Sequence, residues 1–385
     1  MSKWTLLLGI LAASMFLYKV HIQEVTFVDV LQYVAVQDVK VVKEVKPIKR
    51  TKKVVEKKVD QPLSIMAFGD VMLGRYVRTL MDENGVDYPF RKIQNPAGLF
   101  AEGANVVFAN LEGPVNGKGT KGGTSMIFSF NEDIGQILKD FGFTLLSISN
   151  NHALDQGKAG RQNTINTLTN SGLDWCGNAN EVDPSSVYYG KIDQKSYAFI
   201  CLHSATDYLD LNAATDLIKA VRPNVDYLVV SIHWGVEYQH KPNNELQIKP
   251  GHAFVDAGAD LIIGHHPHVV QSFEVYNNKL IIYSLGNFVF DQFWSQDTQE
   301  GLAVGVVLNR SETDYVLHSK MYLFPMKSER SQSRMMNEEE RTKWIEKFIG
   351  YGSYDEVMQQ EIRNGVIEIP GDLDIIGQIN FPHEN

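Results

Sequence analysis

DLIIGHHPH, residues 260–268, is a short apolar run that ends in three histidines within four positions. An uninterrupted apolar run of this length is typical of a strand buried on both faces. Three imidazoles at one strand end rarely serve packing alone, and imidazole nitrogen is a common metal ligand. The stretch therefore predicts a buried strand whose carboxyl end carries a metal site.

Five other apolar runs end just as abruptly in polar side chains. They are LSIMAF before Gly69-Asp70, NVVFA before Asn110-Leu111-Glu112, TLLSIS before Asn150-Asn151-His152, DYLVVSI before His233-Trp234-Gly235 and KLIIYSL before Gly286-Asn287-Phe288. Stretches at 131–140, 159–171 and 246–257 have helical character, so the chain alternates strands with helices and an α/β fold is predicted. In such sheets ligands bind outside the carboxyl ends of the strands, where these polar side chains stand.

The last third of the chain continues with two further strand patterns, at 295–310 and 314–326. Residues 337–350 and 354–363 are typical of helices, and the tail from 364 to 385 is mixed in character.

The N-terminus differs in composition from the rest. Residues 4–18 form an uncharged apolar run between Lys3 and Lys19, which is shorter than the roughly 20 residues that span a bilayer unless Lys19 snorkels and Val20 joins the run. We expect a signal anchor at 1–21 that places the protein in the cell membrane as a single-pass, extracytoplasmic chain. A cleaved secretory signal and a buried N-terminal helix are the alternatives. Residues 22–61 end in a basic stretch and are predicted to be an extracytoplasmic stalk.

The charge is divided unevenly along the chain. Residues 1–60 hold 11 of the 36 Lys and Arg but only 6 of the 46 Asp and Glu, so the remainder is strongly acidic. Because affinity for nucleic acid comes mostly from Lys and Arg, this balance argues against a nucleic-acid partner. The two cysteines, Cys176 and Cys201, form no zinc motif, and one disulfide or two free thiols are equally compatible with their positions.

Six motifs in a fixed order resemble those of the CapA family of capsule and poly-γ-glutamate synthesis proteins. They are GDVMLGR (69–75), ANLEGPV (109–115), SNNHALDQG (149–157), IHWGVEY (232–238), IGHHPHVVQ (263–271) and SLGNFVFDQ (284–292). That family is similar to the calcineurin-like metallophosphoesterases, so the resemblance implies an α/β/β/α sandwich over about 64–325. We therefore expect this domain at 62–326 and a helical extension at 327–385.

The resemblance also implies a metal site that holds one or two divalent ions, of Mn, Fe or Zn type. It implies Asp70 and His268 as ligands of the first ion and Glu112 as the bridging residue. Asn151, His233 and His266 would bind the second ion, and His152 would be the general acid, oriented by Asp155. A two-metal site needs such a mixture of hard oxygen donors and imidazole nitrogens, and metal-bound water is a nucleophile toward phosphoesters.

One position departs from the phosphoesterase pattern. That pattern places a histidine two residues after the first aspartate, and this chain has Met72 there. A thioether is a poor ligand for Mn²⁺ or Mg²⁺. The first metal position is therefore predicted to be one ligand short.

Other residues near the motifs have less specific signals. Arg75 is predicted to bind a substrate phosphate or carboxylate, with a structural ion pair as the alternative. Asn287 is predicted to bind substrate and Asp291 to line the same cleft, although both could instead form a turn. Aromatic residues could wall a polymer groove or belong to the core; they are Trp234, Tyr238, Phe288, Phe293 and Trp294.

Three functions remain open at this point. The first is a membrane-anchored component of capsule or poly-γ-glutamate synthesis or export, acting on an anionic polymer beside other synthase subunits. The second is an extracytoplasmic metal-dependent phosphoesterase or nucleotidase. The third is a metal-free scaffold that binds polymer in the cleft.

Overall fold

The computed structural model describes residues 62–93, 95–101, 103–116, 126–179, 181–205, 209–310 and 316–371. They belong to one compact unit, Val59–Asn385. The expected anchor, 1–21, and stalk, 22–61, lie outside the described residues. Among the helices that are described, none combines the length and apolarity needed to cross a membrane.

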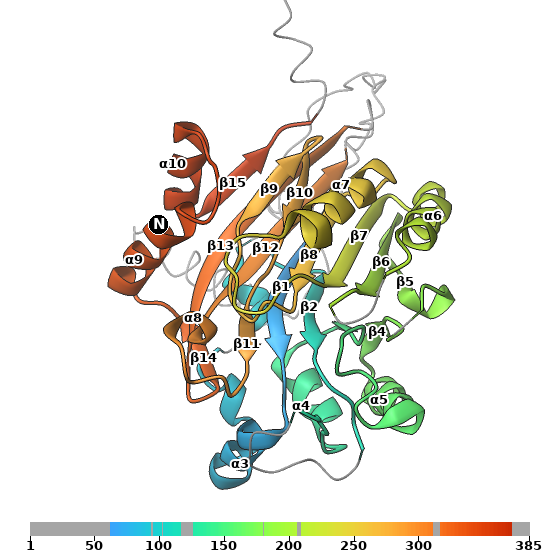
Figure 1. Cartoon of the computed structure of the whole chain (residues 1–385), viewed down its shortest axis with the longest axis vertical. Coiled ribbons are helices and arrows are strands. Elements are labelled where there is room, and N and C mark those ends of the chain that lie inside the picture. The colour runs from blue at the N-terminus through green and yellow to red at the C-terminus, as the bar shows by residue number, and fades with distance from the viewer. Residues whose placement is uncertain are drawn as a thin grey trace, which may run out of the picture. The chain divides into compact units, whose positions relative to one another are not determined.

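Two β-sheets form the centre of this unit (Figure 1). The nine-stranded sheet has the order β14-β13-β12-β1-β2-β3-β4, with β11 beside β1 and β15 beside β13. Its strands are β1 (Leu63–Val71), β2 (Val106–Leu111), β3 (Leu145–Ser147), β4 (Asp174–Cys176), β11 (Asn287–Val289), β12 (Glu300–Arg310), β13 (Leu317–Glu329), β14 (Gln332–Met335) and β15 (Val366–Ile369).

The six-stranded sheet has the order β5-β6-β7-β8-β10-β9. Its strands are β5 (Val187–Ile192), β6 (Lys195–His203), β7 (Tyr227–His233), β8 (Leu261–His265), β9 (Phe273–Tyr276) and β10 (Lys279–Ile282). All six apolar runs singled out in the sequence are strands, namely β1, β2, β3, β7, β8 and β10. Within each sheet these strands pair in parallel, so their carboxyl ends share one edge.

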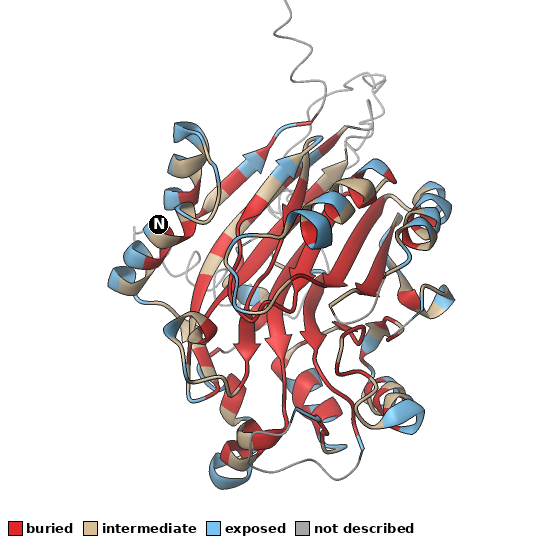
Figure 2. Ribbon diagram, viewed as in Figure 1, coloured by how far each residue is buried: buried red, intermediate tan, exposed pale blue. Residues whose placement is uncertain are grey.

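Side chains that alternate along the central strands divide the interior into three cores. On β1, Ile65 and Ala67 join the core between the two sheets, whereas Met66 and Phe68 face a second core under α3 (Arg75–Asn84), α4 (Ile134–Phe141) and α5 (Gly157–Asn170). A third core packs the other sheet against α6 (Leu211–Val221) and α7 (Lys249–Asp256). Both faces of the central strands are therefore buried (Figure 2), and the layers follow the order α/β/β/α.

The segment after residue 326 is part of the same body. The expected helices at 337–350 and 354–363 are α9 (Glu338–Ile349) and α10 (Glu356–Asn364), and their apolar residues join the core between the sheets. Strands β14 and β15 pair with β13, which crosses the expected domain boundary at 326. The short helix α8 (Gln296–Gln299) precedes β12.

Local signals explain where α9 begins. The Asn337 side chain accepts a hydrogen bond from the Glu340 backbone N–H, and the Glu340 carboxylate accepts one from the Asn337 N–H. This capping box satisfies two backbone donors that a helix start leaves without partners.

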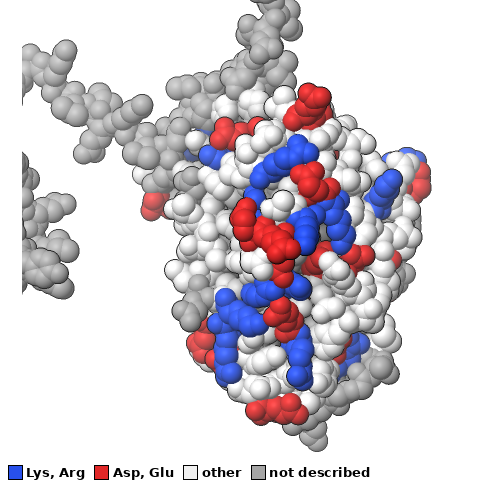
Figure 3. All heavy atoms as spheres, turned by 90° about the vertical axis from the view of Figure 1, so that its left-hand side faces the viewer, with Lys and Arg blue, Asp and Glu red and all other residues white. Residues whose placement is uncertain are grey.

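The face seen from the side of α9 and α10 carries basic and acidic side chains interspersed (Figure 3). Ion pairs account for much of this pattern: Arg334 lies 2.6 Å from both Glu329 and Glu340, and Arg363 lies 2.8 Å from Glu346. Because opposite charges alternate on this face, its net electrostatic potential is small, and the face has no strong attraction for a polyanion.

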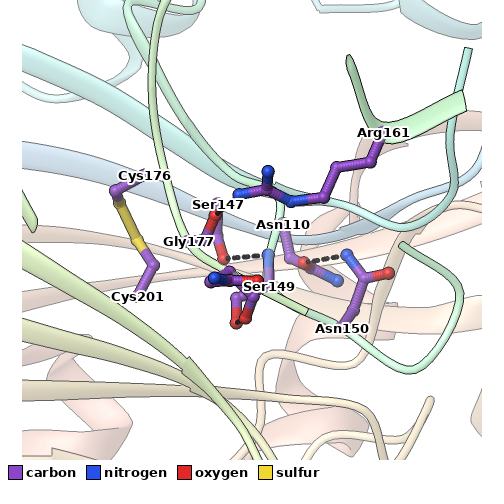
Figure 4. The surroundings of a disulfide bond; sticks show 9 residues. Asn110, Ser147, Ser149, Asn150, Arg161, Cys176, Gly177 and Cys201 are labelled. Carbon is purple, nitrogen blue, oxygen red and sulfur yellow. Dashed lines mark hydrogen bonds between the residues drawn. A yellow bond between two sulfur atoms is a disulfide. The ribbon is translucent and has the colours of Figure 1, made fainter. Parts of the chain in front are cut away.

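Cys176 at the end of β4 and Cys201 in β6 form a disulfide. Of the two states that the sequence left open, the structure has the bonded one. The bond joins the two sheets close to the strand ends that carry Asn110 and Asn150 (Figure 4).

Candidate metal centre

Asp70 lies near the end of β1, fully buried, and forms the base of the site. Its carboxylate accepts hydrogen bonds from the Asn110 amide at 2.8 Å and from the His266 backbone N–H at 3.2 Å. Burial alone would raise the pKa of Asp70, but His265, His268 and Asn110 together hold the pKa below its ordinary value. Asp70 is therefore a fixed, ionised carboxylate.

Glu112 follows β2 directly and is also fully buried, yet neither of its carboxylate oxygens has a hydrogen-bond partner. The nearest imidazole nitrogens are His268 Nε2 at 3.7 Å and His152 Nε2 at 3.8 Å from Oε1. Burial, followed by the charges of Asp70 and Glu237, raises the pKa of Glu112 well above its ordinary value. A buried carboxylate without partners is costly unless a cation compensates it, so this residue fits a bound metal.

His233, at the end of β7, connects the strand ends of the two sheets. Its Nε2 lies 2.8 Å from the Asn151 amide oxygen and 3.1 Å from His266 Nδ1, while its Nδ1 lies 3.2 Å from Asn110. Burial, with the neighbouring imidazoles, lowers its pKa well below the ordinary value, which keeps a ring nitrogen lone pair available. Asn151 and His233, expected at one metal position, are thus in direct contact.

His266 and His268 occupy a strained turn after β8. Both have positive φ, 99° and 58°, a region that non-glycine residues rarely adopt and that recurs at functional sites. Burial lowers the pKa of His266 to about 3, and burial also lowers the pKa of His268. Both side chains therefore face the site as neutral imidazoles.

His152 and Asp155 form the expected pair. The Asp155 carboxylate lies 2.8 Å from His152 Nδ1, and the imidazole stacks on Phe128 with ring centroids 3.8 Å apart. The carboxylate and the ring fix the orientation of the imidazole, so that Nε2 points toward Glu112. These contacts hold the imidazole in one orientation and favour one tautomer.

A cavity of about 210 Å³ opens beside these groups. It is lined by Arg75, Met126, Phe128, His152, Glu237, Tyr238, His268, Phe290, Asp291, Gln292 and Trp294. Arg75 is ion-paired with Asp291 and lies over the Phe128 ring. The structural ion pair expected as the alternative is therefore present, and Arg75 also lines the cavity. Tyr238 and the exposed Trp294 form part of the mouth, whereas Trp234 and Phe288 belong to the core.

Asn287, expected to bind substrate, is buried behind His268. Its side-chain oxygen lies 3.0 Å from His268 Nδ1, and its amide donates to Gln292 and to the Thr298 carbonyl. Its hydrogen-bonding groups are thus engaged, it is not among the residues that line the cavity, and its contact with Nδ1 fits a residue that orients His268.

Met72 belongs to the apolar core. Its side chain is fully buried in the core under α3 and α4, and its sulfur accepts a hydrogen bond from the Gly74 N–H at 3.1 Å. The residue that replaces the expected histidine is therefore a core residue in this structure.

Three further residues lie among these groups, although the sequence assigned none of them an individual role. Asn110 holds Asp70 and His233, and its place after β2 was the available signal. Both ring nitrogens of His265 are buried without hydrogen-bond partners, and Nδ1 lies 3.4 Å from Asp70. Glu237 stands in the IHWGVEY motif and faces His266 and His268.

The acidic and imidazole side chains form two groups in which the potential ligand atoms all lie within 4.8 Å of one another. The inner group is Asp70, Glu112 and His233, all buried. The outer group is Glu237, His266 and His268, of which only Glu237 is partly exposed. Carboxylate oxygens mixed with neutral imidazoles form a ligand set suited to a divalent metal.

This architecture defines a class: an α/β sandwich whose parallel strand ends gather carboxylates and imidazoles into a candidate metal centre. The chain belongs to the family described as bacterial capsule synthesis protein PGA_cap, which matches residues 64–292.

Curated relatives agree with this family. The capsule biosynthesis protein CapA of Bacillus anthracis is 34% identical over 270 residues, which cover 64% of this chain and 64% of that relative. The PGA biosynthesis protein CapA of Bacillus subtilis (strain 168) is 34% identical over 260 residues, which cover 63% of this chain and 67% of that relative. The matched region thus spans about two thirds of each relative. Among solved structures, a novel phosphatase from Mycoplasma pneumoniae aligns with a TM-score of 0.41 and 16% identity over 71% of this chain and 91% of that chain.

Proposed function

We propose that this protein acts in the synthesis or export of an anionic capsule polymer of the poly-γ-glutamate type through a divalent-metal site at its strand ends. Family membership supports the biological role. The observation that carries the site is Glu112, whose two buried carboxylate oxygens lack partners between two imidazoles.

The residues that would hold a metal are Asp70, Glu112, Asn151, His233, His266 and His268. A bound divalent ion would supply Lewis-acid stabilisation of negative charge on a substrate oxygen. The protein's own side chains would position the substrate and transfer a proton. Arg75 would attract an anionic group at the cavity wall, and His152, held by Asp155, would donate the proton.

We further propose that residues 1–21 anchor the chain in the cell membrane, with the stalk at 22–61 and the domain outside the cytoplasm. The Cys176–Cys201 disulfide supports this location, because such bonds persist mainly in oxidising compartments. The partners at that surface would be the polymer and membrane-bound synthase subunits.

A second candidate function is hydrolysis of a phosphoester on a calcineurin-like scaffold. The specific observation in its favour is the His152–Asp155 pair at the cavity wall, facing the fully buried Glu112. A group poised to protonate a leaving group has no role in passive polymer binding.

The test begins with metal content and phosphodiesterase turnover of the full chain, purified in detergent without chelators. We expect stoichiometric metal that Asp70→Asn removes and that His252→Ala, a control histidine paired with Glu274 outside the centre, leaves unchanged. Metal with turnover that His152→Ala abolishes would establish the phosphoesterase. Metal without turnover would favour the polymer function, and a chain that binds no metal would refute the proposal and leave a metal-free scaffold.

A further inference from the structure

Glu237 adds a carboxylate to the outer ligand group. Met72 is buried in the core under α3 and α4, and its thioether is a poor ligand for a hard divalent ion. The outer ligand group has two imidazoles, His266 and His268, and Glu237 supplies the only carboxylate within that group, with ligand atoms no more than 4.8 Å apart. The carboxylate also lines the cavity with His152 and His268, so it faces the open side of the centre.

The loop that carries Glu237 is fixed against the histidine turn. The Trp234 N–H donates to the His265 carbonyl at 3.0 Å, and the Tyr238 N–H donates to the Pro267 carbonyl at 2.8 Å. These bonds bracket Glu237 on both sides. The Tyr238 ring also stacks on His268, with centroids 6.1 Å apart. The position of Glu237 relative to the imidazoles is therefore set by the backbone and not by the side chain alone.

The conformation of this loop has an energetic cost. Tyr238, like His266 and His268, has a positive φ, 63°, at a non-glycine residue. At Gly235, where φ is 89°, a Cβ would lie 2.6 Å from the Gln247 side chain, so only glycine fits the turn. Strained residues persist where the surroundings hold them, and they cluster at ligand sites. Here the strain brings one carboxylate to two imidazoles.

We propose that Glu237 is the third protein ligand of an outer divalent-cation position, with His266 and His268, and that it compensates for Met72. This inference rests on the proposed metal function and adds a ligand to it. A carboxylate in place of an imidazole adds a hard oxygen donor and a negative charge. Two imidazoles and one carboxylate form a ligand set that accepts Mn²⁺, Fe²⁺ or Zn²⁺, so the added negative charge strengthens cation binding without selecting one of these ions.

The experiment is Mn²⁺ titration of the chelator-stripped full chain in detergent, followed by calorimetry and by electron paramagnetic resonance. We expect two Mn²⁺ per wild-type chain with a spin-coupled signal. Glu237→Gln should weaken the outer position by about 100-fold or more, since even outer-shell changes cost about 10–100-fold, and should abolish the coupling. Glu245→Gln, a nearby exposed acid paired with Lys249, is the matched control and should bind two ions.

The outcomes separate the two proposals. If wild-type chain binds no Mn²⁺, the metal function itself fails. If Glu237→Gln binds Mn²⁺ with the wild-type stoichiometry and affinities within about threefold, the Glu237 assignment is overturned while the metal function stands. Thermal unfolding in chelator shows whether Glu237→Gln is folded. Glu237→His, which restores an imidazole, should recover two-ion binding.

Discussion

Replacing Glu112 with glutamine should stabilise the metal-free protein, although the residue is fully buried at the centre of the site. In the absence of a cation, its carboxylate has no hydrogen-bond partner and faces the charges of Asp70 and Glu237. Because its pKa is raised, folding at neutral pH requires Glu112 to take up a proton that it does not hold in the unfolded chain, at about 1.4 kcal/mol for each pKa unit. Glu112→Gln retains the shape and cannot ionise, so we expect the free energy of unfolding at pH 7 to rise by about 1–3 kcal/mol.

The effect should depend on pH and on metal. Because the pKa of Glu112 is raised in the folded state, the folded protein holds the proton more tightly than the unfolded chain does. Stability of the metal-free wild type should therefore fall as pH rises above about 4.5, until the raised pKa is passed, and Glu112→Gln should flatten this slope. Mn²⁺ at about 100 times its Kd should stabilise the wild type by about 2.7 kcal/mol and the variant by much less.

Differential scanning calorimetry in EDTA and in Mn²⁺ measures the effect of the substitution and the stabilisation by metal, and each kcal/mol corresponds to a shift of about 2–4 °C in Tm. Asp260 is a suitable control, since it is a buried carboxylate paired with Arg222 and Arg310. Asp260→Asn should destabilise the protein equally with and without metal. A lower Tm for Glu112→Gln in EDTA, or an equal Mn²⁺ effect in both proteins, would refute the reasoning.

Three other predictions follow from the same geometry. The double variant Cys176→Ser, Cys201→Ser should lower the free energy of unfolding by about 3.5 kcal/mol, the value that the loop-closure relation gives for a separation of 25 residues. Urea titration without reductant measures this change, and an unchanged unfolding midpoint would contradict a stabilising role of the disulfide. If the chain hydrolyses phosphoesters, His152→Ala should reduce kcat by about 10²–10⁴-fold without loss of metal, and Asp155→Asn should reduce kcat by a smaller factor. Loss of metal in either variant would show that the His152–Asp155 pair maintains the metal site rather than transferring a proton. The pKa of His266 is lowered to about 3, so the metal-free protein should lose stability as pH falls from about 6.5 toward 3, and His266→Asn should reduce that acid loss in pH-dependent urea titrations.

The fold could be predicted from the sequence where burial is two-sided. Runs such as those that form β1 and β8 are mostly apolar and fully buried because helices cover one face and the opposite sheet covers the other. Strand β5 alternates in exposure, so its pattern is weak, whereas the helix expected at 159–171 is α5 although few of its residues are buried. The pairing of β15 with β13 depends on contacts between distant segments, which local periodicity does not encode.

The convergence of side chains could be predicted for residues that follow strands directly. Asp70, Glu112, His233 and His266 converge because parallel strands bring their carboxyl ends to one edge. Glu237 lies four residues beyond β7, where the direction of a side chain depends on the loop rather than on the strand. The place of Asn287 near a strand end indicates that it lies close to the site, but only the packing shows that its side chain contacts His268.

The two buried carboxylates, Asp70 and Glu112, differ in their hydrogen bonds and in the direction of their pKa shift. Asp70 already has its hydrogen bonds, and its pKa is held low in the absence of any ion. Glu112 has no such partners, and its pKa is raised. Two neighbouring buried acids cannot both be ionised cheaply without a compensating charge. A cation would therefore act mainly on Glu112, by drawing off its proton and completing its contacts, while Asp70 defines where that cation sits.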